Sequence, residues 1–446
     1  DSLLNNEADL AVHSLKDLPI EDQKDTLIVS MLERADSRDI LFLKKDIFEN
    51  YNNKELRILT SSPRRVYNFS NFLESLIPFN PSNITFEDVR GNIPTRLEKL
   101  LNGDCQGLIV AKAAIDRLIS YGNKDISAKI QSYLDDLLWM IIPLSLNPCA
   151  PGQGAIAIEV NSKRKDIIEL VNKINHNETF SQVAKEREIL QNYGGGCHQK
   201  IGVSIESKFF GQILTIKGQT EEGLEIEKRE VVNQITDWKN IPESNFFPSN
   251  LSKYKLFERK LINKNLKKIN KLKNTNIYVS RENALPKNQN IELTNVVWTS
   301  GVKTWKKLAK KGYWVNGSSD SLGEDDPEIK CLSKNKKWVK LTHNMTQKNY
   351  FKSHKDPQNA RIIPTYELKP VNMNEDLNEK THFYWMSGSA FKLALKNYPK
   401  IINANHSCGP GNTLKTIKKY INKNNINVFL SYEDALKNIT RPGDKK

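Results

Sequence analysis

Short apolar segments alternate with helical patterns over roughly the first 120 residues. Strand-like apolar runs occur at 8–12, 27–32, 55–62, 84–91 and 107–111, and the last three are each followed by a helical pattern. This alternation predicts a mostly parallel sheet with helices on its faces. A segment rich in Leu and Ile continues to about residue 146, and a turn-rich loop then leads into a strand at 155–160.

The rest of the chain shows two further patterns. Residues 180–260 predict a smaller α+β unit, with a helix at 183–193, a glycine run, and strands at 200–206 and 213–219. Residues 261–275 are rich in Lys and Asn and poor in apolar side chains, which predicts a linker. A second α/β pattern runs from 276 to the end. A chain of 446 residues is expected to form roughly two to four domains.

The composition, with 38% hydrophobic and 27% charged residues, is typical of a soluble globular protein. No run approaches the roughly 18 apolar residues that span a bilayer, and the first residues lack the pattern of a signal peptide. We therefore expect a cytoplasmic protein without a membrane partner. The five cysteines are widely spaced and include no C-x-x-C pair, so neither a disulfide framework nor a zinc site is predicted.

The net charge of +15 would suit an anionic partner, of which nucleic acid is the first class to consider. Much of the excess, however, is Lys interleaved with Asn in INKNLKKINKLKNTN, residues 262–276. Such a segment is typical of a solvated linker. Since the sequence also contains no recognisable nucleic-acid-binding motif, we predict no nucleic-acid partner.

Two basic turns and one mixed turn carry the most informative local chemistry. In TSSPRR, Ser62 suits a helix N-cap and Pro63 the first helical position, so Arg64 and Arg65 fall in the first turn. Two arginines beside free backbone N–H groups favour an anion site, and exposed arginines tolerated at a helix end are the alternative. In EADLAVHSLKDLP, Lys16 and Asp17 follow a short strand and are either a solvated ion pair or part of a site.

The segment DVRGNIPTRLEKLLNG, residues 88–103, repeats the first construction. Arg90 precedes a Gly-Asn turn, Arg96 lies in the first turn of a predicted helix, and Gly103 suits its C-terminal cap. Because α/β sheets bind ligands at the carboxyl ends of their strands, these arginines and the Lys16/Asp17 pair are expected to converge on one crevice. An anionic ligand is implied, but no glycine-rich phosphate loop is present.

Cys197 follows three consecutive glycines in QNYGGGCHQKIG. Glycines allow close approach of a bulky group to the main chain, so an exposed thiol here is a candidate for covalent attachment. A small buried side chain at a tight turn is the alternative.

Six segments together resemble the porphobilinogen deaminase (hydroxymethylbilane synthase) family over about residues 1–255. They are, in order, AVHSLKDLP, TSSPRR, VRGNIPTRLEKL, LIVAKAAIDRL, PGQGAIAIE and GGGCHQKIG. The resemblance implies an α/β fold: a periplasmic-binding-protein-like two-domain core plus a small α+β third domain. Domain 1 would comprise 1–33 and 150–175, domain 2 residues 34–149, and domain 3 residues 176–260. It also implies that the family's N-terminal strand, helix and basic loop are missing, so that the chain is N-terminally truncated.

The resemblance further implies a reaction and a cofactor. The family joins four porphobilinogen molecules into hydroxymethylbilane with release of ammonia, on a dipyrromethane attached by thioether to a cysteine that matches Cys197. The family's catalytic aspartate matches Asp17. Cofactor-binding positions match Lys16, Arg64, Arg65 and Arg90, and substrate-binding positions match Ser61, Ser62, Arg96 and Arg117. We expect a monomer that acts on these small molecules. A non-catalytic carboxylate-binding protein on the same scaffold is the alternative.

Residues 276–446 resemble the uroporphyrinogen-III synthase family, through WTSGVKTWKKLAKKGYWV, IIPTYELKP, FYWMSGSAFKLAL and CGPGNTLKTIKKY. That resemblance implies a two-lobed α/β domain that closes the linear tetrapyrrole, or a degenerate domain that has lost this activity. Its candidate substrate-binding residues are Thr304, Ser387, Ser389, Asn412 and Thr413.

Overall fold

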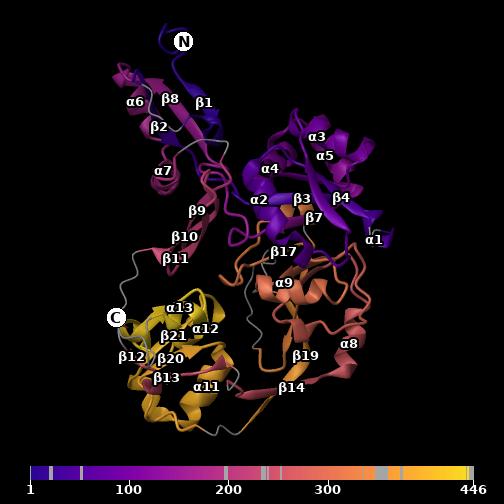
Figure 1. Ribbon diagram of the computed structural model, residues 1–446, viewed down its shortest axis with the longest axis vertical. Helices are drawn as coiled ribbons and strands as arrows, with labels where there is room; N and C mark the ends of the chain where they lie inside the picture. Colours follow the sequence, from indigo (N-terminus) through magenta and orange to yellow (C-terminus); the bar gives the residue numbers. More distant parts are fainter. Residues whose placement is uncertain are drawn as a thin grey trace. The chain divides into compact units, whose positions relative to one another are not determined.

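The computed structural model (Figure 1) divides into two compact units, which we describe separately. Unit 1 comprises residues 1–207 and 213–229, and unit 2 comprises 208–212 and 230–446. The structure describes residues 2–19, 24–50, 54–194, 199–232, 238, 241–251, 254–334, 336–346, 360–371, 375–437 and 439–440. The predicted α/β class is confirmed, because helices accompany several separate sheets.

The N-terminal sheet of unit 1 has the order β1-β8-β2 and is antiparallel, not parallel as predicted. Its strands are β1 (Ala11–Ser14), β2 (Thr26–Met31) and β8 (Ile156–Asn161). Two parallel strands that pair directly need a long crossover connection, usually a helix. The connection between β1 and β2 is too short for one, and the two strands are instead separated by β8. Helices α6 (Lys165–Asn172) and α7 (Asn177–Gln191) accompany this sheet (Figure 1).

The second sheet of unit 1 has five strands in the order β5-β4-β6-β3-β7. They are β3 (Asp39–Lys44), β4 (Glu55–Leu59), β5 (Asn83–Glu87), β6 (Gly107–Ala111) and β7 (Leu137–Ile142). β4 pairs in parallel with β5 and β6, whereas β3 runs antiparallel to β6 and β7. β3 and β7 were not predicted as strands. Residues 39–43 of β3 are all buried, as expected for a strand covered on both faces, so its sequence is an apolar run without alternation.

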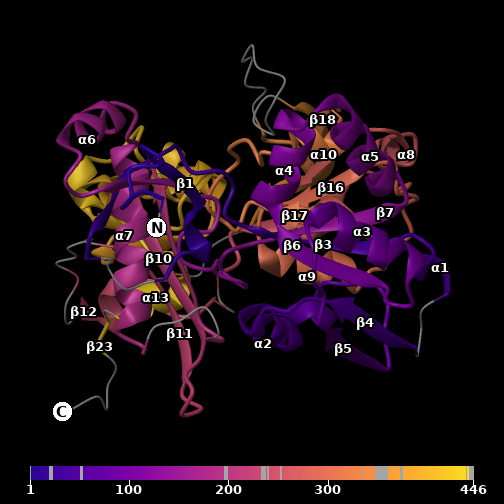
Figure 2. The ribbon, with the colours of Figure 1, turned by 90° about the horizontal axis from the view of Figure 1, so that it is seen from above.

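Helices connect the strands of the five-stranded sheet (Figure 2). They are α1 (Ile47–Asn50), α2 (Pro63–Phe72), α3 (Ile93–Asn102), α4 (Lys112–Tyr121) and α5 (Lys124–Asp135). Ser62 is the N-cap residue of α2 and Pro63 begins it, as predicted, although the Ser62 hydroxyl makes no capping hydrogen bond. Asn92 caps α3 by accepting a 3.0 Å hydrogen bond from Thr95 N, and Gly103 ends it.

A third sheet contains β9 (Gly202–Lys208), β10 (Gly211–Gln219) and β11 (Glu225–Val232), in the order β11-β10-β9. The predicted extension of this domain to residue 260 is wrong. β12 (Ile241–Pro242) pairs with β23 (Ile439–Thr440), and β13 (Phe246–Phe247) pairs with β20 (His382–Trp385). Buried Phe246 and Phe247 pack among the aromatic side chains of unit 2, which draws this segment away from domain 3.

Unit 2 contains a six-stranded sheet in the order β14-β19-β18-β15-β16-β17. Its strands are β14 (Phe257–Leu261), β15 (Asn276–Val279), β16 (Val296–Thr299), β17 (Gly317–Ser318), β18 (Trp338–His343) and β19 (Arg361–Pro370). The predicted linker at 261–275 is wrong, because it contains α8 (Asn263–Ile269). Ile269 of that helix is fully buried, and Asn265 Nδ2 donates a 2.8 Å hydrogen bond to the Pro364 carbonyl of β19.

A four-stranded parallel sheet forms the other part of unit 2, in the order β13-β20-β21-β22. It adds β21 (Asn405–Cys408) and β22 (Ile426–Val428) to the strands already given. The helices of unit 2 are α8, α9 (Val302–Ala309), α10 (Lys330–Ser333), α11 (Gly388–Asn397), α12 (Asn412–Ile417) and α13 (Tyr432–Leu436). Among the residues described, no helix has both the length and the apolar character needed to span a bilayer.

Candidate functional site

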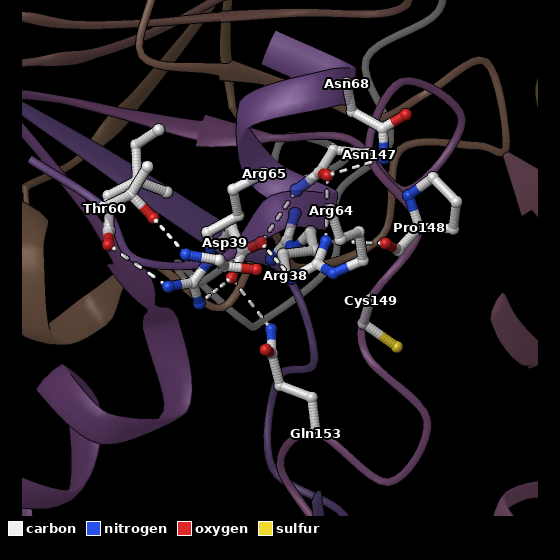
Figure 3. A network of polar contacts seen from close by, with 12 residues as sticks. Arg38, Asp39, Thr60, Arg64, Arg65, Asn68, Asn147, Pro148, Cys149 and Gln153 are labelled. Atoms are coloured by element: carbon white, nitrogen blue, oxygen red, sulfur yellow. Dashed lines mark hydrogen bonds and ion pairs between the residues drawn. The ribbon is translucent and has the colours of Figure 1, made fainter. Parts of the chain in front are cut away.

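A buried carboxylate organises the arginine pair of unit 1 (Figure 3). Asp39 begins β3 and is 1% exposed. It accepts hydrogen bonds from Arg64 Nη2 at 2.8 Å and Arg65 Nη2 at 2.7 Å. It also accepts from Asn147 Nδ2 at 2.7 Å and Gln153 Nε2 at 2.9 Å. Four donors from three separate parts of the chain therefore converge on one carboxylate.

The electrostatics of this carboxylate follow from its surroundings. Burial by itself would raise the pKa of Asp39, but the charges of Arg65 and Arg64 outweigh it and hold that pKa below its ordinary value. Asp39 is therefore ionised at neutral pH. Removing one partner of a buried ion pair costs roughly 3–5 kcal/mol, so the cluster is an integral part of the fold.

The two arginines of α2 point into the protein. Besides Asp39, Arg64 Nη1 donates to Asn147 Oδ1 at 2.8 Å and to the Pro148 carbonyl at 2.7 Å. Arg65 Nη1 donates to the Ile109 carbonyl at 3.2 Å, whereas its buried Nε has no hydrogen-bond partner among the described residues. Arg64 is thus occupied by protein acceptors, and Arg65 keeps one donor for another group.

The second basic turn lies beside the first. The Ser61 hydroxyl donates to the Val89 carbonyl and accepts from the Val89 N–H, both at 2.9 Å, which joins the ends of the two chain segments. Arg96 Nε donates to the Gly91 carbonyl at 2.7 Å. Burial, and then the charge of Arg65, lower the pKa of Arg96, so these guanidinium groups lie within electrostatic reach of each other. Arg90 is exposed.

Lys16 and Asp17 lie in a single 3-10 turn, Leu15–Asp17, that follows β1. Arg187 of α7 holds this turn by donating to the carbonyls of Leu15 and Leu18, both at 3.4 Å, and of Pro19. Leu15 is fully buried beneath the turn. α7 thus fixes the turn that carries the two charged side chains.

The charge of Lys16 couples the turn to the arginines. Burial, and then Arg65, lower the pKa of Lys16, while Asp17 and Asp39 act in the opposite direction. Asp17 is exposed. The structure thus brings Lys16 and Asp17 together with Arg64, Arg65 and Arg96. Arg117 of α4 instead donates to the Gly154 carbonyl at 2.8 Å.

A second buried carboxylate, Glu186 of α7, was also missed by the sequence analysis. It accepts both arms of the Arg34 guanidinium, at 2.7 and 2.8 Å, and is fully buried. It also accepts from Gly152 N at 3.1 Å and Ile205 N at 2.8 Å, which ties α7, β9 and the loop before β8 together. Two sequence features could have indicated these buried carboxylates. Glu186 falls on the buried face of a helix, and Asp39 stands at the start of an apolar run.

Cys197 lies outside the described residues, which stop at Gly194 and resume at Gln199. Gln199 Nε2 donates to the Tyr193 carbonyl at 2.9 Å. Gly202, which begins β9, is so close to α2 that an added Cβ would lie 3.1 Å from Arg64 Cδ. The first residue of β9 therefore lies directly beside Arg64.

The described cysteines include two buried thiols in unit 1. Burial raises the pKa of Cys149 to about 12 and that of Cys105 to about 11. Both thiols therefore stay protonated at neutral pH, which disfavours nucleophilic attachment at either.

In unit 2, the candidate residues Ser387, Ser389, Asn412 and Thr413 lie at two neighbouring helix N-termini. Ser387 caps α11 by accepting from Ala390 N at 3.2 Å. Asn412 and Thr413 begin α12. α11 and α12 follow the adjacent parallel strands β20 and β21. Both helix N-termini therefore lie at the carboxyl ends of these strands, on the same side of the four-stranded sheet.

Thr304 belongs to the other sheet of unit 2, in the first turn of α9. Gly301, the N-cap residue of α9, lies against Ser321, and Gly411, the N-cap residue of α12, lies against Gly323. The short segment 321–323 therefore lies between the N-termini of the two helices and brings Thr304 toward Thr413.

Comparison with known proteins identifies relatives of the N-terminal half. Residues 1–169 match the family model described as "Porphobilinogen deaminase, dipyromethane cofactor binding domain". The chain is 34% identical over 220 residues to the porphobilinogen deaminase of Syntrophomonas wolfei subsp. wolfei, a match that covers 48% of this chain and 63% of the relative. The chain thus spans less than two thirds of that relative's length.

Two further comparisons concern a second relative and a solved structure. The porphobilinogen deaminase of Francisella tularensis subsp. novicida is 31% identical over 236 residues, which cover 52% of this chain and 70% of the relative. An arginine-transport periplasmic binding protein from Legionella pneumophila matches 43% of this chain and 74% of its own chain, at 17% identity and a TM-score of 0.21, a likeness that carries no argument. On the sequence relationships, the chain belongs to the porphobilinogen deaminase family.

Proposed function

We propose that the protein joins four molecules of porphobilinogen into hydroxymethylbilane, releases ammonia at each step, and acts as a monomer. One observation carries the proposal. We call Lys16, Arg64, Arg65 and Arg96 the arginine cluster. Among the described residues these four cations accompany two carboxylates, Asp17 and Asp39. A surplus of positive charge at a partly buried site favours binding of an anionic ligand.

Dipyrromethane fits this donor set. Its acetate and propionate side chains need charged donors, and Arg65 Nε is a buried donor without a partner among the described residues. Lys16, Arg65 and Arg90 would hold the cofactor, which Cys197 would bind through a thioether. Arg64, whose guanidinium donates to Asp39, Asn147 and the Pro148 carbonyl, would support them through the shared Asp39. When bound, the cofactor supplies the free pyrrole end to which the first substrate is joined.

The substrate's carboxylates would bind to the outer members of the same surface. Ser61, Ser62 and Arg96 are the candidates there, and Arg117, which donates to the Gly154 carbonyl, is a further candidate apart from them. Arg96 uses Nε to bind the Gly91 carbonyl, which fixes the orientation of the guanidinium group while its terminal nitrogens stay available for a carboxylate. Holding the substrate in this way converts an encounter in solution into a reaction between oriented groups.

We assign the catalytic role to Asp17. Loss of ammonia from porphobilinogen leaves a positively charged pyrrole, and the attacking ring is also positively charged before it loses a proton. A carboxylate beside the pyrrole N–H groups would stabilise both charges and accept or return the proton. The exposed carboxylate of Asp17, on a turn fixed by Arg187, suits this role.

For unit 2 we propose cyclisation of the linear product to uroporphyrinogen III. Thr304, Ser387, Ser389, Asn412 and Thr413 would bind its carboxylates through their side chains and through the backbone N–H groups of α9, α11 and α12. The support is the position of these residues at three helix N-termini, two of which lie at the carboxyl ends of the neighbouring strands β20 and β21.

One assay tests both parts of this proposal. The full chain is incubated with porphobilinogen, the product is oxidised, and the uroporphyrin isomers are separated. We expect predominantly the type III isomer from the wild type, and a loss of product of roughly 100-fold or more from Asp17→Asn, which removes the charge but keeps the shape.

The control is Asp25→Asn, which changes an exposed aspartate near the start of β2 and should keep full activity. Near-normal turnover by Asp17→Asn would contradict the role of Asp17. Normal turnover that yields only the spontaneously formed type I isomer would contradict the role of unit 2 alone.

A further inference from the structure

A second group of cations lies in unit 2, apart from the residues considered so far. It consists of Arg259 of β14, Arg281, which follows β15, and His343, the last residue of β18; we call these three residues the basic cluster. Val279 pairs with Leu341 across β15 and β18. Arg281 and His343 each follow two residues later, so the two residues lie beside each other where the neighbouring strands end.

Tyr366 of β19 connects Arg259 to this group. Its ring lies 5.9 Å from the His343 ring, centroid to centroid. Tyr366 is paired with Leu261 of β14, and Arg259 precedes Leu261 by two residues. Since side chains two residues apart share a face of the sheet, Arg259 lies on the face that carries Tyr366.

The arginines of the basic cluster have no ion-paired anion among the described residues, although the charge of Glu282 acts on both of them. In the described part of the chain, neither the Arg259 nor the Arg281 guanidinium forms a hydrogen bond or an ion pair. The nearby Glu282 is paired with Lys307 at 3.2 Å. Partial desolvation, and then the charge of Arg281, lower the pKa of Arg259. Like charges held together without an ion-paired anion of their own are unfavourable, so a bound anion would stabilise this arrangement.

His343 gives independent evidence for the same conclusion. Its Nδ1 is buried and has no hydrogen-bond partner among the described residues, an arrangement that costs free energy unless another group completes it. Burial, and then the charges of Lys340, Arg281 and Arg259, lower the pKa of His343 to about 4. Lys340 is itself paired with Glu324, so the two arginines are the cations left for a ligand.

The basic cluster also lies close to the N-terminus of α11. The Tyr254 hydroxyl accepts a 3.3 Å hydrogen bond from the backbone N–H of Met386, which immediately precedes the N-cap Ser387. Burial raises the pKa of Tyr254, and the charges of Arg281 and Arg259 act against that rise. The Tyr254 hydroxyl is therefore near both arginines and the N-terminus of α11. The arginine pair and the helix N-terminus can thus bind separate carboxylates of one ligand.

We infer that the basic cluster, together with the N-terminus of α11, binds the carboxylate groups of a polycarboxylate ligand. Two guanidinium groups on different strands and a helix N-terminus provide donors at several separate points, which suits a ligand with several carboxylates. That the natural ligand is the linear tetrapyrrole rests on the proposed function of unit 2, whereas the site itself does not.

The test uses uroporphyrin I, a stable octacarboxylate, with the isotope-labelled full chain at pH 7.5. Because the arginines of unit 1 are also proposed to bind carboxylates, the readout must be local. The His343 ring resonances, assigned by their loss in His343→Gln, provide it. We expect a saturable shift of these resonances in the wild type. In the double variant Arg259→Gln/Arg281→Gln the apparent Kd should rise at least tenfold.

The matched control is Arg361→Gln, which removes an exposed arginine at the opposite end of β19 and should leave the Kd unchanged. Absence of a saturable His343 shift in the wild type, or an unchanged Kd in the double variant, would overturn the inference. So would a shift caused by pyrophosphate but not by uroporphyrin I. Tight binding without formation of the type III isomer would contradict only the proposed cyclisation.

Discussion

At the scale of single residues, Asp39 is the side chain on which the arginine cluster depends. Asp39→Asn removes the charge that both Arg64 and Arg65 contact. We expect the free energy of unfolding to fall by roughly 3–5 kcal/mol, because two buried cations lose their counter-ion. Denaturant unfolding measures this loss. The exposed control Asp25→Asn should stay within about 0.5 kcal/mol of the wild type, and a similarly small change in Asp39→Asn would contradict the account.

The same substitution should alter the acid dependence of stability. Arg65 and Arg64 outweigh the effect of burial and hold the pKa of Asp39 below 3.8, its ordinary value. A carboxylate with a lowered folded-state pKa stabilises the fold fully above the unfolded-state pKa, and this contribution is lost as the pH falls. Below about pH 4, stability should therefore fall less steeply in Asp39→Asn than in the wild type.

The sequence predicted the cations of the site better than their partners. Arg64, Arg65 and Arg96 stand out because each lies in the first turn of a helix with a recognisable start. Asp39 and Glu186 do not, because the groups that make their burial tolerable come from segments far away in the chain. The local sequence also could not predict that Arg64 donates its hydrogen bonds to Asn147 and the Pro148 carbonyl instead of to a ligand.

At the scale of elements, the start of β9 lies tightly against α2 and against the loop that precedes β8. A Cβ at Gly202 would lie 2.2 Å from the Pro148 carbonyl oxygen and 3.1 Å from Arg64 Cδ. Gly202→Ala should therefore destabilise the protein by roughly 1–3 kcal/mol, since the strand must move. It should also reduce the fraction of chains that carry the cofactor.

Gly409→Ala is the matched control for this prediction. A Cβ there would meet Tyr384 Oη at 3.7 Å, an ordinary contact, so stability and cofactor content should change little. Denaturant unfolding and intact mass measure the two quantities. Equal behaviour of the two alanine variants would contradict a tight junction at Gly202.

Elements with local signals were predicted, and elements defined by distant pairing were not. α2 and α3 begin where their prolines indicate, and α3 ends at Gly103. β14 and α8 were missed, because β14 is stabilised by pairing with β19, about a hundred residues later. A Lys- and Asn-rich composition describes the exposed face of α8 and hides the buried Ile269.

At the scale of the whole molecule, the sequence predicted the α/β class but not every boundary. The six deaminase motifs fall within unit 1, and the first five of them lie within the family match over residues 1–169. The end of the third domain was placed too late, because β12 and β13 join strands more than 130 residues further along the chain. Sequence patterns give the type of an element more readily than the sheet it joins.

The central claim is that this chain carries a covalent dipyrromethane on Cys197 beside the arginine cluster. The most direct test is the intact mass of the full chain, produced in cells that synthesise porphobilinogen. We predict a mass excess equal to two linked pyrroles, absent from Cys197→Ser and retained in Cys331→Ser, a change at a half-buried cysteine of unit 2. A wild-type chain of unmodified mass, or an excess that survives in Cys197→Ser, would contradict the account.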